Sequence, residues 1–173
     1  SVGSLQQFLT FTRETGAAEC ATVVETDNFT PEVSFDYTDD FYIPVSTPFR
    51  LEGTATDANG DDLTYNWEQF DLGPPSDIRD PEGNVRYFPR LNNLVDNIIT
   101  LGEKLPDYSR DMTFRLVARD NNSEAGGVDW KQLHFYTSDE AGPFVVNNPE
   151  GETWKVGQYR EVTWDVANTD KTP

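Results

Sequence analysis

The chain has 173 residues, which is enough for one domain of ordinary size with some chain to spare. Its 31 acidic and 13 basic residues give a formal net charge of -18. A surface this acidic repels nucleic acid and anionic lipid, so we exclude those partners and expect cation binding or a salt-rich exterior. Because 36% of the residues are hydrophobic, many of them aromatic, the chain is too rich in core-forming side chains to be disordered.

Neither a membrane span nor an export signal is evident in the sequence. No apolar run approaches the roughly 20 residues that a membrane helix needs. The N-terminus lacks the basic and then apolar build of a signal peptide, so we expect whatever exports the chain to lie outside it. Cys20 is the single cysteine, and it therefore has no partner for an internal disulfide.

The segment SLQQFLTFTRET, residues 4–15, predicts one short amphipathic helix. Ser4 is its expected N-cap and Gly16 its expected end. The helical spacing is carried by Leu5, Phe8, Leu9 and Thr12. A helix this short is marginal alone, so it needs to pack against something larger.

After Pro31 the chain consists of short alternating runs separated by turn residues, which is typical of an all-β immunoglobulin-like sandwich. In LTYNWEQF, residues 63–70, the side chain of Trp67 lies on the face expected to pack between the two sheets. Alternation likewise assigns Met112 and Phe114 to one face of the run at 112–119. The expected strands are 33–37, 41–45, 49–56, 63–70, 112–119 and 128–136.

Two further stretches lie outside this regular pattern. Residues 71–93 hold four prolines and are longer than an ordinary connection, so we predict that they are the most mobile part of the sandwich and join little of its ladder. Ala-Gly-Pro at 141–143 indicates a linker, after which residues 144–166 begin a new set of strands. Roughly 30 residues are too few for a sandwich of seven strands, so this region is expected to be the start of a second β-module.

The stretch TATDANGDD, at residues 54–62, suggests a calcium site. Calcium takes six to eight oxygen ligands, and acidic or amide side chains at alternate positions around a glycine bend suit it. No glutamate closes a twelve-residue loop, so the stretch is not an EF-hand, and another loop must complete the shell. The candidate ligands are Asp57, Asn59, Asp61 and, from the end of the strand at 112–119, Asp120 with Asn121. The alternative, which stays open, is a β-turn whose Asp and Asn side chains bond only their own backbone.

The sequence argues against an autonomous enzyme. His134 is the single histidine and has no cysteine or serine partner in a recognisable catalytic pattern, so we expect it to be a satisfied polar side chain. The adjacent acidic pairs Asp39-Asp40 and Asp61-Asp62 point to opposite sides of an extended chain. Neither pair therefore converges on one bond of a sugar.

Several longer stretches resemble one known family. IPVSTPFRLEGTATDANGDDLTYNWEQFDLGP, followed in order by FPRLNN, LPDYSRDMTFRLVARDNN and GGVDW, resembles the immunoglobulin-like module, akin to PKD and cadherin-like domains, that follows the catalytic domain of secreted bacterial reprolysin-like zinc metallopeptidases. The stretch GPFVVNNPEGETWKVGQYREVTWDVANT is similar to the opening of their next module. The first 20 residues resemble the last helix of the peptidase domain.

The resemblance implies three parts and a supporting role. Residues 1–27 would be the tail of an upstream metallopeptidase domain, 28–140 the sandwich, and 141–173 the start of a second β-module. Cys20 would pair with an upstream cysteine. The family's zinc motif, His-Glu-x-x-His with a third histidine, has no counterpart here. The implied function is a non-catalytic spacer or substrate-presenting module that is secreted or lies at the cell surface. The resemblance implies no zinc in this part of the protein, and calcium would stiffen the module. The alternative is an adhesive or carbohydrate-binding module of a cell-surface protein.

Overall fold

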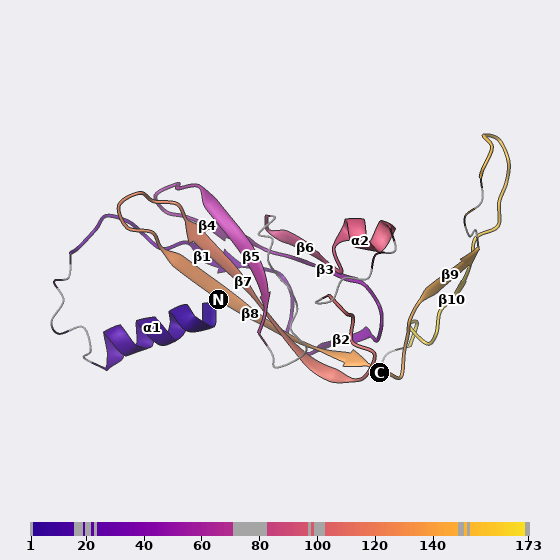
Figure 1. The fold of residues 1–173 in the computed structure, drawn as a ribbon, viewed down its shortest axis with the longest axis horizontal. Coiled ribbons are helices and arrows are strands. Elements are labelled where there is room, and N and C mark those ends of the chain that lie inside the picture. Colours follow the sequence, from indigo (N-terminus) through magenta and orange to yellow (C-terminus); the bar gives the residue numbers. More distant parts are fainter. Residues whose placement is uncertain are drawn as a thin grey trace.

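A computed structural model describes most of the chain. The described residues are 2–15, 19, 22, 24–70, 83–96, 98, 103–148, 151 and 153–171. Strands dominate the regular structure, and the two helices, α1 (Val2–Glu14) and α2 (Leu91–Val95), are short. The predicted all-β, sandwich-like class is therefore confirmed (Figure 1).

One layer of the sandwich is a four-stranded sheet. Its order is β2 (Phe41–Pro44), β8 (Val128–Ser138), β7 (Arg110–Asp120) and β5 (Leu63–Gln69). The strands β5, β7 and β8 pair antiparallel, whereas β2 runs parallel to β8. The two longest strands, β7 and β8, lie in the middle of the sheet, so their inward side chains supply much of the core.

The facing layer is built from four shorter strands. β1 (Glu32–Ser34) pairs with β4 (Thr54–Thr56), and β3 (Phe49–Glu52) pairs with β6 (Val85–Phe88). Gly53 joins β3 to β4, and its backbone N–H donates to Asn84 O at 3.1 Å. A Cβ at Gly53 would meet the buried end of the Leu116 side chain, so glycine leaves room for that side chain where the two layers approach closely.

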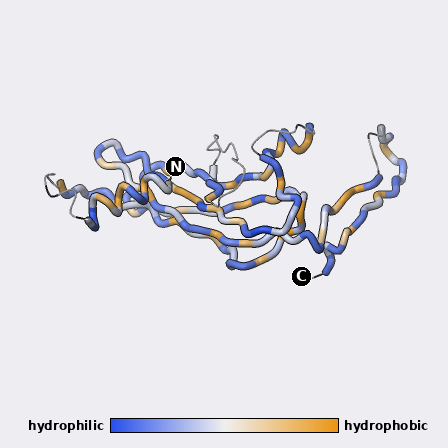
Figure 2. Tube along the Cα trace, turned by 60° about the horizontal axis from the view of Figure 1, so that its bottom comes forward, coloured by the Kyte–Doolittle hydropathy of each residue, from blue (hydrophilic) through white to orange (hydrophobic). Residues whose placement is uncertain are grey.

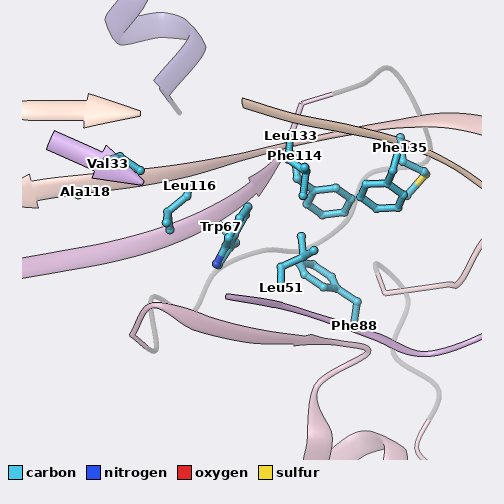
Figure 3. Packing of buried hydrophobic residues seen from close by; sticks show 10 residues of the cluster. Val33, Leu51, Trp67, Phe88, Phe114, Leu116, Ala118, Leu133 and Phe135 are labelled. Carbon is cyan, nitrogen blue, oxygen red and sulfur yellow. The ribbon is translucent and has the colours of Figure 1, made fainter. Parts of the chain in front are cut away.

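The core between the layers is aromatic (Figure 3). Trp67 is almost fully buried, as predicted, and its indole Nε1 donates to Asn84 O at 3.2 Å. The rings of Phe114 and Phe135 stack at 5.7 Å, and Phe88 meets Phe114 edge-on at 4.8 Å. The buried cluster comprises Val33, Leu51, Trp67, Phe88, Met112, Phe114, Leu116, Ala118, Leu133 and Phe135. The predicted alternation of β7 is thus confirmed.

Helix α1 contacts the outer face of the four-stranded sheet. Gln6 Oε1 accepts a hydrogen bond from Arg115 Nη1 at 3.0 Å, and the same guanidinium lies 3.4 Å from the centre of the Phe70 ring. Desolvation by burial lowers the pKa of Arg115, and the nearby charge of Glu68 opposes that shift. On the other side of the helix Phe8 and Phe11 are about 60% and 61% exposed. The helix therefore packs on the sheet with one face only.

The helix boundary differs from the sequence prediction. α1 already includes Val2, so the expectation that Ser4 is the N-cap is wrong. Ser4 is exposed on the helix, and a serine that points to solvent is tolerated inside a helix although it is favoured at a cap. The expected stop at Gly16 and the environment of Cys20 lie outside the described residues.

The long insertion also differs in part from its prediction. Residues 71–82 lie outside the described residues, but β6 pairs with β3 along its whole length. The prediction that the insertion joins little of the ladder is therefore wrong for this strand. The reason is that Arg86 and Phe88 both point inward: Phe88 enters the core, and Arg86 is held by Glu103 Oε1 at 2.8 Å.

The last described segment forms a separate two-stranded ribbon, β9 (Val145–Asn148) with β10 (Thr163–Asp165). It extends beside the sandwich (Figure 1), and hydrophobic stretches run along it (Figure 2). Gly142 N donates to Ala167 O at 2.8 Å, which ties the ribbon to the linker. Its larger apolar side chains are mostly exposed, and an isolated pair of strands is only marginally stable in water. Within the described part of the chain, neither helix is long and apolar enough to cross a bilayer.

Candidate metal centre

Strand pairing brings the predicted calcium ligands to one end of the sandwich. Residues 57–62 connect β4 to β5, and Asp120 is the last residue of β7. Because β5 and β7 are antiparallel with Leu63 opposite Asp120, the start of one strand lies beside the end of the other. The loop that carries Asp57 and Asp61 therefore meets Asp120, and we call these three aspartates the acidic pole.

The spacing of the acidic pole suits a shared cation. One carboxylate oxygen from each of Asp57, Asp61 and Asp120 lies within 4.8 Å of the others. Oxygens that bind one calcium ion at 2.3–2.6 Å lie at most about 5 Å apart. The spacing of the three side chains is therefore compatible with one shared ion.

Asp57 organises its own loop and keeps one oxygen free. Its Oδ1 accepts from Asn59 N at 2.9 Å and from Asp61 N at 3.2 Å, while Gly60 adopts a φ of 78°. This is the β-turn that the sequence offered as an alternative. Asp57 Oδ2 is buried and has no hydrogen-bond partner among the described residues. A buried acceptor without a partner is costly, so the turn leaves an oxygen that a cation would satisfy.

Asp120 is only about 5% exposed and is held by hydrogen bonds from two segments, the loop between β7 and β8 and the segment before β1. Its Oδ1 accepts from Gly127 N at 2.7 Å and from Asn122 N at 3.4 Å, and its Oδ2 accepts from Asn28 Nδ2 at 2.9 Å. Desolvation by burial acts to raise the pKa of Asp120, but these hydrogen bonds favour the carboxylate and together lower the pKa below its ordinary value. The group is therefore an anion at neutral pH.

Asn59, the fourth predicted ligand, is turned toward a different partner. Its Oδ1 accepts from Phe29 N at 2.7 Å and its Nδ2 donates to Asp27 O at 2.9 Å. The side chain therefore fastens the segment before β1 to the loop that carries Asp57 and Asp61. Asn121, which the sequence also placed at this pole, donates to Asp62 O through both its backbone N and its Nδ2.

Sequence reasoning missed two side chains at the acidic pole. Asn28 donates to Asp120 Oδ2 and to Ala125 O, and its Oδ1 is buried without a hydrogen-bond partner among the described residues. Asn122 Nδ2 donates to Asp61 Oδ2 at 3.1 Å. Asn28 comes from far away in the sequence, before β1, so no local pattern identifies it.

The glycine pair at 126–127 was a signal that could have been used. A Cβ at Gly127 would lie 2.5 Å from Asp120 Oδ2 and 3.0 Å from Thr30 Cα. The backbone therefore approaches the buried carboxylate as closely as it does only because residue 127 has no side chain. In the sequence, the signal for this close approach is a Gly-Gly pair that lies in the loop after an acidic residue and directly before the next strand.

The other polar candidates meet at His134. His134 Nδ1 lies 2.9 Å from Asp40 Oδ1, and the backbone N–H of His134 donates to Asp39 at 3.0 Å. The histidine is thus a satisfied polar side chain, as expected. Asp39 and Asp40 make separate contacts, one with backbone and one with the ring.

Comparisons with known proteins do not bear on this site. The sequence matches no known family and no curated protein. The interpretation of the acidic pole therefore rests on its geometry.

The close approach at Gly127 gives a first prediction. Gly127→Ala places a methyl group against Asp120 and Thr30, so we expect it to lower the free energy of unfolding by about 1–3 kcal/mol in denaturant melts. The matched control is Gly126→Ala, whose Cβ would lie 3.7 Å from Asp120 Oδ1, an ordinary contact. Equal losses from the two variants would contradict this account of the pole.

The hydrogen bonds to Asp120 give a second prediction. A carboxyl whose pKa is lower in the folded chain stabilises the fold above its unfolded pKa of about 3.9, and that contribution is lost as the pH falls through the folded value. In calcium-free buffer the Asp120 carboxyl should titrate below 3.9 by NMR. Asn28→Ala should raise its pKa toward the ordinary value. A carboxyl signal that titrates at or above the ordinary value in the wild type would refute the assignment.

Proposed function

We propose that this chain is a non-catalytic immunoglobulin-like module that binds calcium at the acidic pole and serves as a rigid supporting part of a larger secreted or cell-surface protein. The observation that carries the proposal is the convergence of Asp57, Asp61 and Asp120 on one point, beside a buried carboxylate oxygen with no hydrogen-bond partner.

The ligand chemistry favours calcium over other common ions. The pole offers carboxylate oxygens, and oxygen ligands suit hard cations. Asn28, whose Nδ2 donates to Asp120, adds a buried amide Oδ1 without a hydrogen-bond partner among the described residues. Three carboxylates give a strongly negative site, and bidentate binding and water complete a shell of six to eight oxygens. Zinc would instead call for histidine or cysteine, and His134 lies on β8 near Asp40 instead.

Calcium would hold the loops at this end of the sandwich together. Its ligands come from the loop before β5 and from the end of β7, and Asn28 and Asn59 already tie the segment before β1 to the same place. An ion here would hold these segments together and stiffen one end of the sandwich. Such a module suits a spacer that must keep its neighbours at a fixed orientation.

The parent protein is proposed on the resemblance to the reprolysin-like zinc metallopeptidases. In that arrangement the catalytic zinc and the hydrolysis belong to an upstream domain, α1 is the last helix of that domain, and Cys20 pairs within it. The exposed Phe8 and Phe11 on α1 support this part of the proposal, because they form an apolar face that the described residues leave uncovered. The module would hold the catalytic domain off the cell surface or against a protein substrate.

An adhesive or carbohydrate-binding module is the second candidate. The observation in its favour is that Trp154 and Trp164, in the ribbon region, are about half exposed, and exposed tryptophans can stack on sugar rings. A glycan array with the wild type and with Trp164→Ala separates the two functions. Selective binding to a glycan that the substitution abolishes would favour adhesion, and we expect no such binding for a spacer.

The third prediction tests calcium binding directly. An ion that binds only the folded chain raises the melting temperature by mass action, by about 2.7 kcal/mol of stability at a hundredfold excess over its dissociation constant, or a few degrees. We expect this rise between EDTA and millimolar calcium, and we expect Asp61→Ala to abolish it. Asp62→Ala, which removes the neighbouring exposed carboxylate, should keep it.

Two melting results would contradict calcium binding at the acidic pole. If the wild type melts at the same temperature in EDTA and in calcium, the acidic pole is a polar turn. If Asp61→Ala and Asp62→Ala reduce the shift equally, calcium acts through general charge and not through this site.

A further inference from the structure

A second polar cluster lies on the outer face of the four-stranded sheet, at the end away from the acidic pole. Tyr42 on β2 and Asp111 on β7 both stand opposite Tyr136 on β8, and residues opposite one another on paired strands share a face. With His134 and Asp40 these residues form what we call the tyrosine patch. Asp111 and Asp120 are nine positions apart on β7, so the patch and the acidic pole are about 30 Å apart.

The tyrosine patch presents an aromatic stack to solvent. The rings of Tyr42 and Tyr136 stack at 5.1 Å with an angle of 25° between their planes, and His134 packs edge-on against Tyr136 at 4.7 Å. Tyr42 is about 53% exposed. Asp40 Oδ1 lies 2.9 Å from His134 Nδ1 and fixes the histidine ring. The histidine therefore supports Tyr136, while Tyr42 stays accessible to solvent.

Negative charge surrounds this stack. A shallow hollow of about 480 Å³ lies beside the two tyrosines, and the carboxylates of Asp111, Asp139 and Glu140 line it together with one guanidinium, that of Arg110. Desolvation by burial, and then the charges of Asp40 and Asp111, raise the pKa of the Tyr136 hydroxyl. A cation that enters the hollow therefore meets an excess of negative charge.

The chain itself pairs cations with aromatic rings elsewhere. Arg115 lies 3.4 Å from the centre of the Phe70 ring, and Lys131 Nζ lies 4.7 Å from that of Phe35. A planar guanidinium can stack on a ring while its N–H groups donate to carboxylates at the rim. The tyrosine patch offers both elements on an exposed surface.

We propose that the tyrosine patch is a docking site for an arginine side chain presented by a basic segment of a partner protein. The guanidinium stacks on the exposed tyrosine pair, and the carboxylates that line the hollow accept its N–H groups. A net charge of -18 steers such a segment toward the chain. A neutral sugar could stack on the same rings but would gain nothing from the surrounding charge. This site is independent of calcium and goes beyond the supporting role proposed above.

The fourth prediction tests this docking site. The probe is a fluorescein-labelled peptide of alternating arginine and serine, with a lysine counterpart, titrated by fluorescence anisotropy at about 0.15 M salt. We expect saturable binding that is tighter for the arginine peptide. Tyr42→Ala should weaken it about tenfold, in line with the strength of a partly desolvated cation–π contact. Asp111→Asn should weaken it by more than the exposed-charge control, Asp96→Asn. Tyr42→Phe, which keeps the ring, should retain it.

Matched controls separate docking from general attraction. Tyr87→Ala removes a partly exposed tyrosine on the facing layer, and Asp96→Asn removes one exposed charge at the end of α2. Neither should change the affinity by more than about twofold, because exposed charges act weakly at this salt concentration. Equal weakening by Asp96→Asn and Asp111→Asn, or full binding by Tyr42→Ala, would overturn the proposal. So would a glycan that binds through Tyr42 when the peptide does not.

Discussion

The buried carboxylate of Asp120 is the group on which the end of this sandwich depends. It takes hydrogen bonds from Asn28, Asn122 and Gly127, which belong to segments on both sides of the fold. A carboxylate that is removed from water must be compensated by such donors, because an unpaired buried charge is very costly. These segments are therefore held in place by the need to satisfy one anion. Asn122 in turn donates to Asp61, which links the loop before β5 to the same place.

The long strand β7 connects this pole to the rest of the molecule. Its inward side chains, Phe114 and Leu116 among them, fill the core, so the strand cannot slip by one residue without exposing them. The same register fixes Asp120 at one end and Asp111 at the other. The hydrophobic core thus does more than stabilise the fold, because it sets where both polar clusters stand.

Much of the fold follows from the sequence because alternation is a strong signal where one face of a strand is buried. Alternation predicted the runs that became β5, β7 and β8 and the burial of Trp67. It did not predict which strands pair, so the meeting of Asp57 and Asp61 with Asp120 was only an expectation until the pairing of β5 with β7 was known. It did not give β6, which lies in a proline-rich stretch and places Arg86 inward. An inward arginine looks like a surface residue until its partner, Glu103, is known.

The details of the site were harder to predict because they depend on contacts between distant segments. The spacing of Asn59 fits a ligand as well as that of Asp61, yet its amide is satisfied by the backbone of Asp27 and Phe29. Asn28 reaches Asp120 across 92 positions. Local chemistry can identify which residues suit an ion, but the tertiary fold decides which of them face it.

The most direct test of this account is a crystal structure of the chain grown in millimolar calcium, with anomalous scattering used to identify the ion. We expect one calcium ion bound by oxygens of Asp57, Asp61 and Asp120 at 2.3–2.6 Å, with Asp57 Oδ2 among them. A well-ordered acidic pole without an ion, in which water alone satisfies Asp57 Oδ2, would contradict the central claim.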